Sequence, residues 1–162
     1  MSIKDHPKAG VNFYDITNIL KDKELLLLVI NQLSWCFRKP IDIVVGIESR
    51  GFILASAVAN QIGAGFVPLR KAGKLPRDVF SIGYDLEYGK ETLELHRDAI
   101  QPEQNVLIID DVLATGGTAE AAVKLVSLTG AGSINLAFLI EIESLLGRKK
   151  LHGYKYESII KV

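Results

Sequence analysis

Two adjacent carboxylates, Asp110 and Asp111, and the sequence Thr-Gly-Gly-Thr at residues 115–118 are the groups in this chain best suited to chemistry. The pair follows the apolar run Val-Leu-Ile-Ile, which predicts a buried strand over residues 106–109. Small loop residues let backbone N–H groups surround an anion, and a helix predicted from Thr118 adds its positive dipole end. We interpret residues 106–118 as a cradle for a phosphate and a sugar.

The acidic pair also has a plainer interpretation, because an aspartate at a strand end can simply cap the next helix. Neighbouring residues leaving a strand project to opposite sides, so a functional pair can hold two sugar hydroxyls, or one hydroxyl and a hydrated metal. The glycine sequence that follows favours function. It also disfavours a phospho-acceptor receiver domain, and the chain contains neither the P-loop pattern nor the Gly-x-Gly-x-x-Gly dinucleotide pattern.

Composition indicates a globular protein with one domain over residues 1–162, because 162 residues with 48% hydrophobic content suffice for a core. Nineteen basic and nineteen acidic residues cancel, so no nucleic-acid or membrane partner is expected from bulk charge. The single cysteine, Cys36, is typical of a reducing compartment. The longest apolar run, residues 25–30, is far shorter than the roughly 20 residues of a membrane span. We expect a cytoplasmic protein.

The apolar pattern alternates between strand-like and helix-like segments, which predicts an α/β fold with a central, mostly parallel sheet flanked by helices. Residues 1–19 are expected to form an irregular arm, and residues 70–98 a basic loop and a β flap over the carboxyl edge of the sheet. Helices are predicted at residues 22–38, 52–62, 118–129 and 143–150, and core strands at 41–47, 65–69, 106–109, 134–140 and 154–162.

Residues 106–118 resemble the phosphoribosyl pyrophosphate signature of the type I phosphoribosyltransferases. Residues 44–52, Val-Val-Gly-Ile-Glu-Ser-Arg-Gly-Phe, are similar to the pyrophosphate loop of that family, and residues 70–76 to its dimer-contacting basic loop. Residues 84–89 are similar to its mobile flap, and residues 7–13 to the segment that cups the purine. The similarity covers the chain from about residue 7 to residue 147 and is greatest to the members that use adenine.

The resemblance implies the type I phosphoribosyltransferase fold and transfer of ribose 5-phosphate from phosphoribosyl pyrophosphate to adenine, giving AMP and pyrophosphate. It also implies a homodimer and a Mg²⁺ ion held by the diphosphate, the ribose hydroxyls and water near Asp110 and Asp111, without direct ligation by side chains. Two alternatives stay open: a transferase for hypoxanthine or xanthine, and a non-catalytic sensor of phosphoribosyl pyrophosphate. The neutral charge and the missing DNA-binding appendage disfavour the sensor.

Site residues follow from the same resemblance. Those implied for the 5′-phosphate are Ala114, Thr115, Gly116, Gly117 and Thr118. Those implied for the diphosphate are Glu48, Ser49, Arg50 and Gly51, with a cis peptide at Glu48-Ser49, together with Arg70, Lys71 and Lys74, which would reach a neighbouring subunit. Those implied for the base are Val11, Asn12, Phe13 and Tyr88, and those implied for catalysis are Glu87, Asp110 and Asp111.

Glu87 is the expected acid/base, because desolvation under a closed flap raises the pKa of a glutamate and suits it to proton exchange with a purine. Tyr14 departs from the family pattern, which commonly has arginine after the stacking phenylalanine. Any charge that such an arginine supplies is absent at this position, and the arm before Pro7 is short.

Overall fold

The computed structural model describes residues 2–3, 13–37, 39–86 and 89–162. Four of the expected site residues, Val11, Asn12, Glu87 and Tyr88, lie outside this part of the chain. The backbone of Phe13 is described, in the short strand β2 (Phe13–Tyr14), which pairs antiparallel with β1 (Ser2–Ile3).

Seven strands form the main sheet of the described residues, in the order β5-β6-β4-β3-β7-β8-β9. The four neighbouring pairs from β4 to β9 are parallel, whereas β6 pairs antiparallel with both β4 and β5. The mostly parallel sheet with an antiparallel flap is therefore confirmed. The strands are β3 Ile43–Ile47, β4 Gly65–Lys71, β5 Val79–Leu86, β6 Gly89–His96, β7 Asn105–Leu113, β8 Ser133–Glu141 and β9 Lys155–Lys161.

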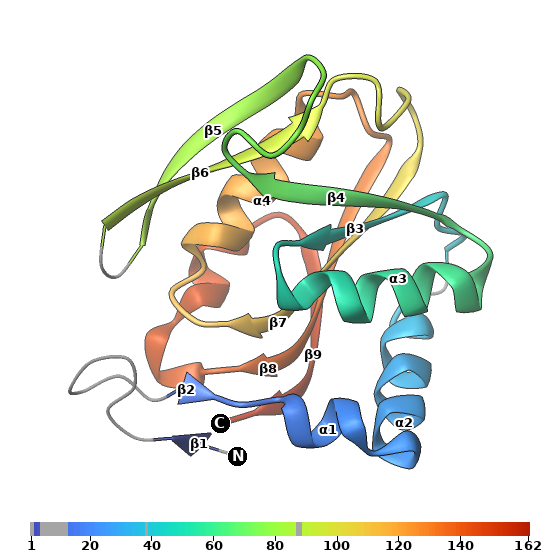
Figure 1. Ribbon diagram of the computed structural model, residues 1–162, viewed down its shortest axis with the longest axis vertical. Helices are drawn as coiled ribbons and strands as arrows, with labels where there is room; N and C mark the ends of the chain where they lie inside the picture. Colours follow the sequence, from blue (N-terminus) through green and yellow to red (C-terminus); the bar gives the residue numbers. More distant parts are fainter. Residues whose placement is uncertain (1, 4–12, 38, 87–88) are drawn as a thin grey trace.

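Alternate residues of the central strands serve two separate cores, which is why these strands are apolar throughout. Ile108 of β7 packs on the face covered by α4 (Gly117–Ser127), whereas Ile109 packs on the opposite face with residues of α2 (Lys23–Ser34) and α3 (Arg50–Ile62). Figure 1 shows α3 and α2 on one side of the sheet and α4 on the other, beneath the β5–β6 hairpin.

Strand β7 is longer than the predicted strand over residues 106–109. Its pairing with β3 stops at Gly46 opposite Ile109, but its pairing with β8 continues through Asp110 to Leu113. The acidic pair therefore lies inside a strand, just past the end of β3, rather than after the strand. Pairing with β8 places Asp110 opposite Phe138 and resumes at Val112, which keeps both aspartates at the carboxyl edge of the sheet.

Helix boundaries agree with the expected pattern in part. Asp22 caps α2 as predicted, accepting hydrogen bonds from the backbone N–H groups of Glu24 and Leu25 at 2.9 and 3.0 Å. The helix predicted at residues 143–150 is instead two 3₁₀ helices, η1 (Glu143–Leu145) and η2 (Gly147–Leu151). A short helix, α1 (Thr17–Lys21), replaces the end of the expected irregular arm.

Among the described residues, no helix has both the length and the apolar character to cross a membrane.

Candidate active site

The acidic pair lies near the carboxyl end of β7, with both side chains lining one cavity. Asp111 is buried, with 5% of its surface exposed, and meets α3 through an ion pair of 2.9 Å between its Oδ2 and the Nε of Arg50. Asp110 Oδ1 accepts a hydrogen bond of 2.9 Å from the backbone N–H of Asp111. Both side chains line one cavity, and Asp110 also borders a second, smaller one. The projection of the pair to opposite sides stays a prediction, because both side chains line the same cavity.

Burial makes both aspartates weaker acids than usual. The pKa of Asp110 is raised well above its ordinary value, first by desolvation and then by the charge of Asp111. Desolvation also raises the pKa of Asp111, although the guanidinium of Arg50 opposes the effect. A cation or several hydroxyl donors in the cavity would stabilise the ionised pair, so the two carboxylates are suited to a polyhydroxyl ligand or a hydrated metal.

The glycine loop, which we define as residues 114–118, joins β7 to α4. Gly116 adopts φ +79° as the residue before the helix, and a Cβ there would lie 2.4 Å from the carbonyl oxygen of Gly147. A Cβ on Gly147 would in turn lie 2.2 Å from the carbonyl oxygen of Ala114. The glycine loop therefore has no room for a side chain at Gly116, because η2 packs directly on it. It borders the smaller cavity, of about 250 Å³.

Gly147 has a structural role that the sequence interpretation missed, because residues 143–150 were predicted to form a helix. Arg148 secures the same segment through its Nε, 3.1 Å from Glu141 Oε1, and its NH2, 3.1 Å from Glu143 Oε1. Glu141 is 1% exposed at the end of β8. The glycine inside a helical pattern was the available signal, since such a glycine often has a packing role.

Glu48 organises the basic loop, which we define as residues 70–77. The Glu48-Ser49 peptide is cis, as the resemblance implies. The side chain of Glu48 is 7% exposed. The Glu48 carboxylate accepts hydrogen bonds from Arg70 Nε at 3.3 Å, from the backbone N–H of Lys71 at 2.9 Å and from Lys74 Nζ. Desolvation, the largest influence, raises the pKa of Glu48, but the three donors together outweigh it and lower the pKa to about 2.

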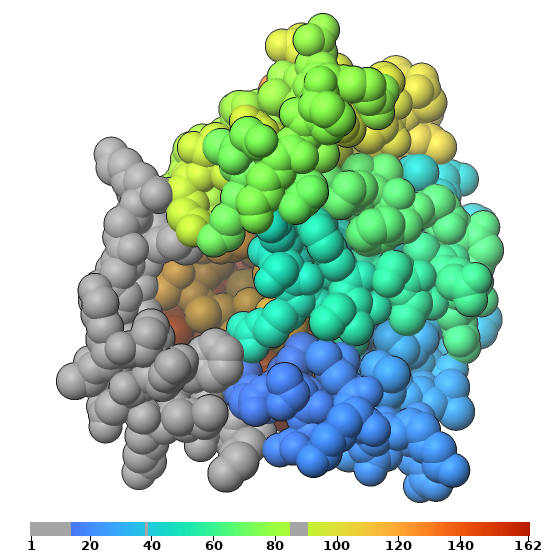
Figure 2. Space-filling model, in the orientation of Figure 1, coloured from blue at the N-terminus to red at the C-terminus, as the bar shows by residue number. Residues whose placement is uncertain are grey.

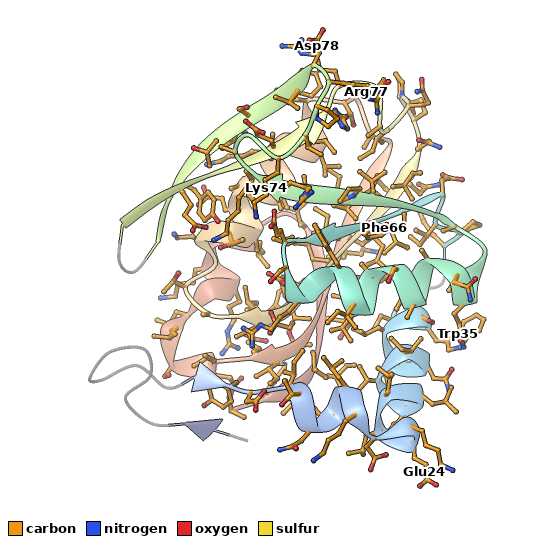
Figure 3. The ribbon with its side chains drawn as sticks, in the orientation of Figure 1. Glu24, Trp35, Phe66, Lys74, Arg77 and Asp78 are labelled. Carbon is orange, nitrogen blue, oxygen red and sulfur yellow. The ribbon has the colours of Figure 1, made fainter. Side chains whose placement is uncertain are left out.

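The basic loop thus contacts Glu48 of its own chain, which belongs to the segment that resembles the pyrophosphate loop of the family. Lys74 follows β4, and its side chain reaches the end of β3, where Glu48 stands (Figure 3). Lys71 and Lys74 line the same cavity as the acidic pair. Within one chain, these cations already share a space with Asp110 and Asp111.

Arg50 and Gly51 connect α3 to the acidic pair. Besides its ion pair with Asp111, Arg50 donates a hydrogen bond of 3.1 Å from NH1 to the carbonyl oxygen of Tyr14, which ties the amino-terminal arm to the site. A Cβ on Gly51 would lie 2.8 Å from the carbonyl oxygen of Ile109 and 2.9 Å from Asp110 Oδ1. Gly51 therefore contributes by letting α3 begin against β7.

The larger cavity has a volume of about 550 Å³ and opens between the β5–β6 hairpin and the start of α3. Figure 2 shows this hollow, with orange atoms of the chain beyond β7 at its floor. The larger cavity is lined by nine of the predicted site residues: Glu48, Ser49, Arg50, Lys71, Lys74, Asp110, Asp111, Ala114 and Thr118. The smaller cavity adds Thr115, Gly116 and Gly117. Arg70 and Gly51 border neither cavity. Residues of the lining that were not predicted are Tyr14, Tyr84, Glu91, Val112 and Ile142.

Tyr84 and Glu91 bring the flap into this cavity from β5 and β6. The Tyr84 hydroxyl donates to Glu91 Oε2 at 3.1 Å, and Lys71 Nζ lies 2.5 Å from Glu91 Oε1. Desolvation raises the pKa of Tyr84 to about 12, so its hydroxyl stays protonated and available as a donor. For Glu91 the available signal was its position two residues before Leu93 in the strand predicted over residues 91–96, which puts both side chains on the same face.

No group of three or more His, Cys, Asp or Glu side chains in the described ranges is arranged to hold a metal ion. The acidic pair offers two carboxylates at one edge of the larger cavity. Mg²⁺ commonly keeps several waters and binds through one or two carboxylates together with substrate phosphates, so this pair fits a hydrated ion brought in with a phosphorylated ligand.

Comparison with known proteins identifies close relatives over almost the whole chain. Residues 15–162 match the phosphoribosyl transferase domain family. The adenine phosphoribosyltransferase of Alkaliphilus metalliredigens is 51% identical over 160 residues, covering 98% of this chain and 94% of the relative. The crystal structure of the Thermoanaerobacter pseudethanolicus adenine phosphoribosyltransferase is 45% identical with a TM-score of 0.95, covering 100% of this chain and 95% of that one. The Giardia lamblia enzyme, crystallised with 9-deazaadenine, is 43% identical with a TM-score of 0.96, covering 100% and 93%.

Proposed function

This chain belongs to the adenine phosphoribosyltransferase family, and from that membership we propose that it transfers ribose 5-phosphate from phosphoribosyl pyrophosphate to N9 of adenine, forming AMP and pyrophosphate. The observation that carries the proposal is the position of the acidic pair, which lies between the glycine loop on one side and Lys71 and Lys74 on the other. A 5-phosphorylated sugar with a diphosphate at C1 has the same order of groups.

In this reaction the bond between C1′ and the diphosphate oxygen breaks while N9 of the base forms the new bond. Positive charge builds on the ribose ring and negative charge on the leaving group, so catalysis depends on position and electrostatics. Asp110 and Asp111 face the ribose hydroxyls near the developing cation. Backbone N–H groups of the glycine loop and of the start of α4 hold the 5′-phosphate.

The diphosphate is assigned to the opposite end of the larger cavity, which we call the diphosphate side: residues 48–50, Lys71 and Lys74. Ser49 supplies its backbone amide, and Arg50, Lys71 and Lys74 supply positive charge. Both lysines line the cavity of their own chain, whereas the resemblance implies that they reach a neighbouring subunit. Glu48 acts on the cations rather than on the ligand, because it holds Lys74 and the backbone of Lys71 in place. Arg70 belongs to the same assembly through its contacts with Glu48.

Mg²⁺ is part of the proposal as a hydrated ion that would accompany the donor and would supply positive charge against the diphosphate. Asp110 and Asp111 are the residues placed to contact its water shell.

The base site is proposed from the family resemblance. Val11, Asn12 and Phe13 would recognise adenine, Tyr88 would cover it, and Glu87 would exchange a proton with the purine ring. The 9-deazaadenine bound by the Giardia lamblia relative, an analogue of adenine, supports this choice of base. Flap closure over the cavity would keep water away from the reactive sugar.

A single domain over residues 1–162, a homodimer and a cytoplasmic location complete the proposal. Ile53 of α3 and Phe66 of β4 are 46% and 38% exposed, and Phe66 stacks edge-on with Phe52 at 6.0 Å between ring centroids, which leaves an apolar area beside the basic loop for a second copy. The free thiol of Cys36 suits a reducing compartment. Light scattering of the purified protein tests the dimer.

The decisive experiment incubates the purified protein with phosphoribosyl pyrophosphate, Mg²⁺ and one purine at a time: adenine, hypoxanthine or xanthine. AMP and pyrophosphate formed with adenine alone support the proposal. Turnover confined to another purine would contradict it and favour the sister transferase. Donor binding without turnover of any base would favour a sensor.

A further inference from the structure

Glu91 places a carboxylate where the proposed reaction needs positive charge. It lies on β6, lines the larger cavity and contacts two groups at once: the ammonium of Lys71 at 2.5 Å and the hydroxyl of Tyr84 at 3.1 Å. Lys71 belongs to the basic loop and Tyr84 to the other strand of the flap hairpin. Glu91 therefore joins the flap to the diphosphate side.

Three carboxylates hold the cations around this cavity, but they differ in exposure. The side chains of Glu48 and Asp111 are each 7% exposed, whereas that of Glu91 is 29% exposed and its partner Lys71 is 46% exposed. Glu48 has several donors, and removing them would leave a buried charge without compensation. The Glu91–Lys71 pair is screened by water and weak, as exposed ion pairs generally are. It is the pair that an incoming anion can most easily replace.

We propose that Glu91 is a placeholder for the diphosphate: it pairs with Lys71 and Tyr84 before the donor binds and yields both to the donor's diphosphate when the donor binds. The proposal deepens the function proposed above and rests on it. A diphosphate carries several negative charges against the single charge of Glu91, so it attracts Lys71 more strongly. Glu91 is a positioning residue in this scheme and sets how tightly the donor is held.

The exchange also couples the diphosphate to the flap. Tyr84 and Glu91 face each other across the hairpin, in register as opposite residues of β5 and β6. Once Lys71 turns to the diphosphate, Glu91 loses its cationic partner. The Glu91 carboxylate is then repelled by the diphosphate beside it. Both effects favour movement of the hairpin relative to the basic loop. Donor binding and flap position are thereby linked through one carboxylate.

The test is the variant Glu91→Gln, which removes the negative charge of this side chain but keeps its shape. Calorimetry measures the dissociation constant of Mg²⁺-pyrophosphate, and steady-state kinetics measure KM for the donor and kcat with adenine. Because the variant removes a competitor for Lys71, we expect binding of both pyrophosphate and donor to tighten about two- to fivefold, which matches the strength of a partly exposed ion pair. We expect kcat to stay within about twofold, since Glu91 does not touch the reacting atoms.

Two matched variants separate the placeholder role from general charge and from structure. Glu120→Gln removes a carboxylate that pairs with Lys124 on α4 and borders neither site cavity, and it should leave pyrophosphate affinity unchanged. In a Lys71→Gln background, Glu91→Gln should give no further tightening, because the group that it competes for is gone.

Unchanged or weaker pyrophosphate binding in Glu91→Gln would overturn the proposal, as would equal tightening in Glu120→Gln. Tightening that persists in the Lys71→Gln background would also overturn it. Pyrophosphate binding needs no base, so this result stands apart from the adenine assay. If the wild-type protein does not turn over adenine, the proposed function fails while the placeholder is still tested.

Discussion

The glycine loop and the diphosphate side both face anions in the proposed reaction, yet they are built from different groups. The smaller cavity beside the glycine loop is lined, within the described residues, by backbone and by small or apolar side chains plus Asp110, with no lysine or arginine. The diphosphate side has Arg50, Lys71 and Lys74, each in contact with a carboxylate of the same chain. One end is fixed by packing, and the other is a set of paired charges.

This difference matches what each end has to do. The 5′-phosphate stays on the sugar throughout the reaction, so a rigid loop locked against η2 can hold it without changing. The diphosphate must bind, have its bond broken and leave. Cations that can pass between an internal carboxylate and a ligand suit that cycle, because release of the product is assisted when the carboxylate returns.

The largest expected effect comes from removing the charge that separates the two ends. Replacing Asp110 and Asp111 together by Asn should lower kcat by about 100- to 1,000-fold, the usual cost of losing a transition-state electrostatic contact. The fold should be retained, as shown by an unchanged circular dichroism spectrum. Transfer rates equal to wild type would remove the pair from the site and leave the two ends unconnected.

A second prediction compares one glycine from each end. Gly116 and Gly73 both have positive φ, +79° and +77°, but a Cβ meets the Gly147 backbone at 2.4 Å in the first and nothing within 4 Å in the second. Gly116→Ala should raise the donor KM more than about tenfold and lower Tm, because the loop must shift. Gly73→Ala should cost only the backbone strain of about 1–2 kcal/mol.

Comparable donor KM values in Gly116→Ala and Gly73→Ala would mean that close packing of the glycine loop is unimportant for phosphate binding. Denaturant unfolding of both variants measures the stability that each one loses, and this loss should be larger for Gly116→Ala. The comparison between a rigid and an exchangeable end depends on this pair of results.

Glu48 gives the third prediction, which concerns stability and pH. Its folded-state pKa of about 2 lies below the ordinary 4.5, so its contribution is complete above pH 4.5 and is lost as the pH falls toward 2. Glu48→Gln should lower the free energy of unfolding by about 1–3 kcal/mol at neutral pH, after allowing for the partly exposed Arg70 and Lys74. Urea unfolding at several pH values measures this difference, which should shrink in acid.

The matched control is Glu120→Gln, which breaks the exposed pair with Lys124 and should change stability by about 0.5 kcal/mol or less, with little dependence on pH. A pH-independent loss in Glu48→Gln, equal to that in the control, would show that Glu48 does not hold the basic loop by charge.

The smallest effect is expected for Tyr84→Phe, which removes the hydroxyl that donates to Glu91 and keeps the ring. Donor KM should change less than about threefold, because one partly exposed hydrogen bond is lost. Tyr154→Phe, on an exposed tyrosine outside both site cavities, is the reference. A large fall in kcat for Tyr84→Phe would instead make its hydroxyl a direct participant in the reaction.

The local features of the site were predictable from the sequence because neighbouring residues encode them. The apolar run before Asp110 indicated a buried strand, the residues at 114–118 indicated a small loop before a helix, and Asp22 indicated a helix start. Where the local pattern failed, neighbouring elements decided: β7 extends to Leu113 because β8 continues to pair with it.

The amino-acid sequence by itself determined the order of the elements, the acidic pair and the family to which they belong. Only the tertiary structure decided which charges meet: Arg50 with Asp111, Lys74 with Glu48, and Lys71 with Glu91. The two partners of each pair are 20 or more residues apart in the sequence, so no local spacing predicts the pairing. Periodicity specifies the face of an element, whereas the packing of one element on another selects the partner that this face meets.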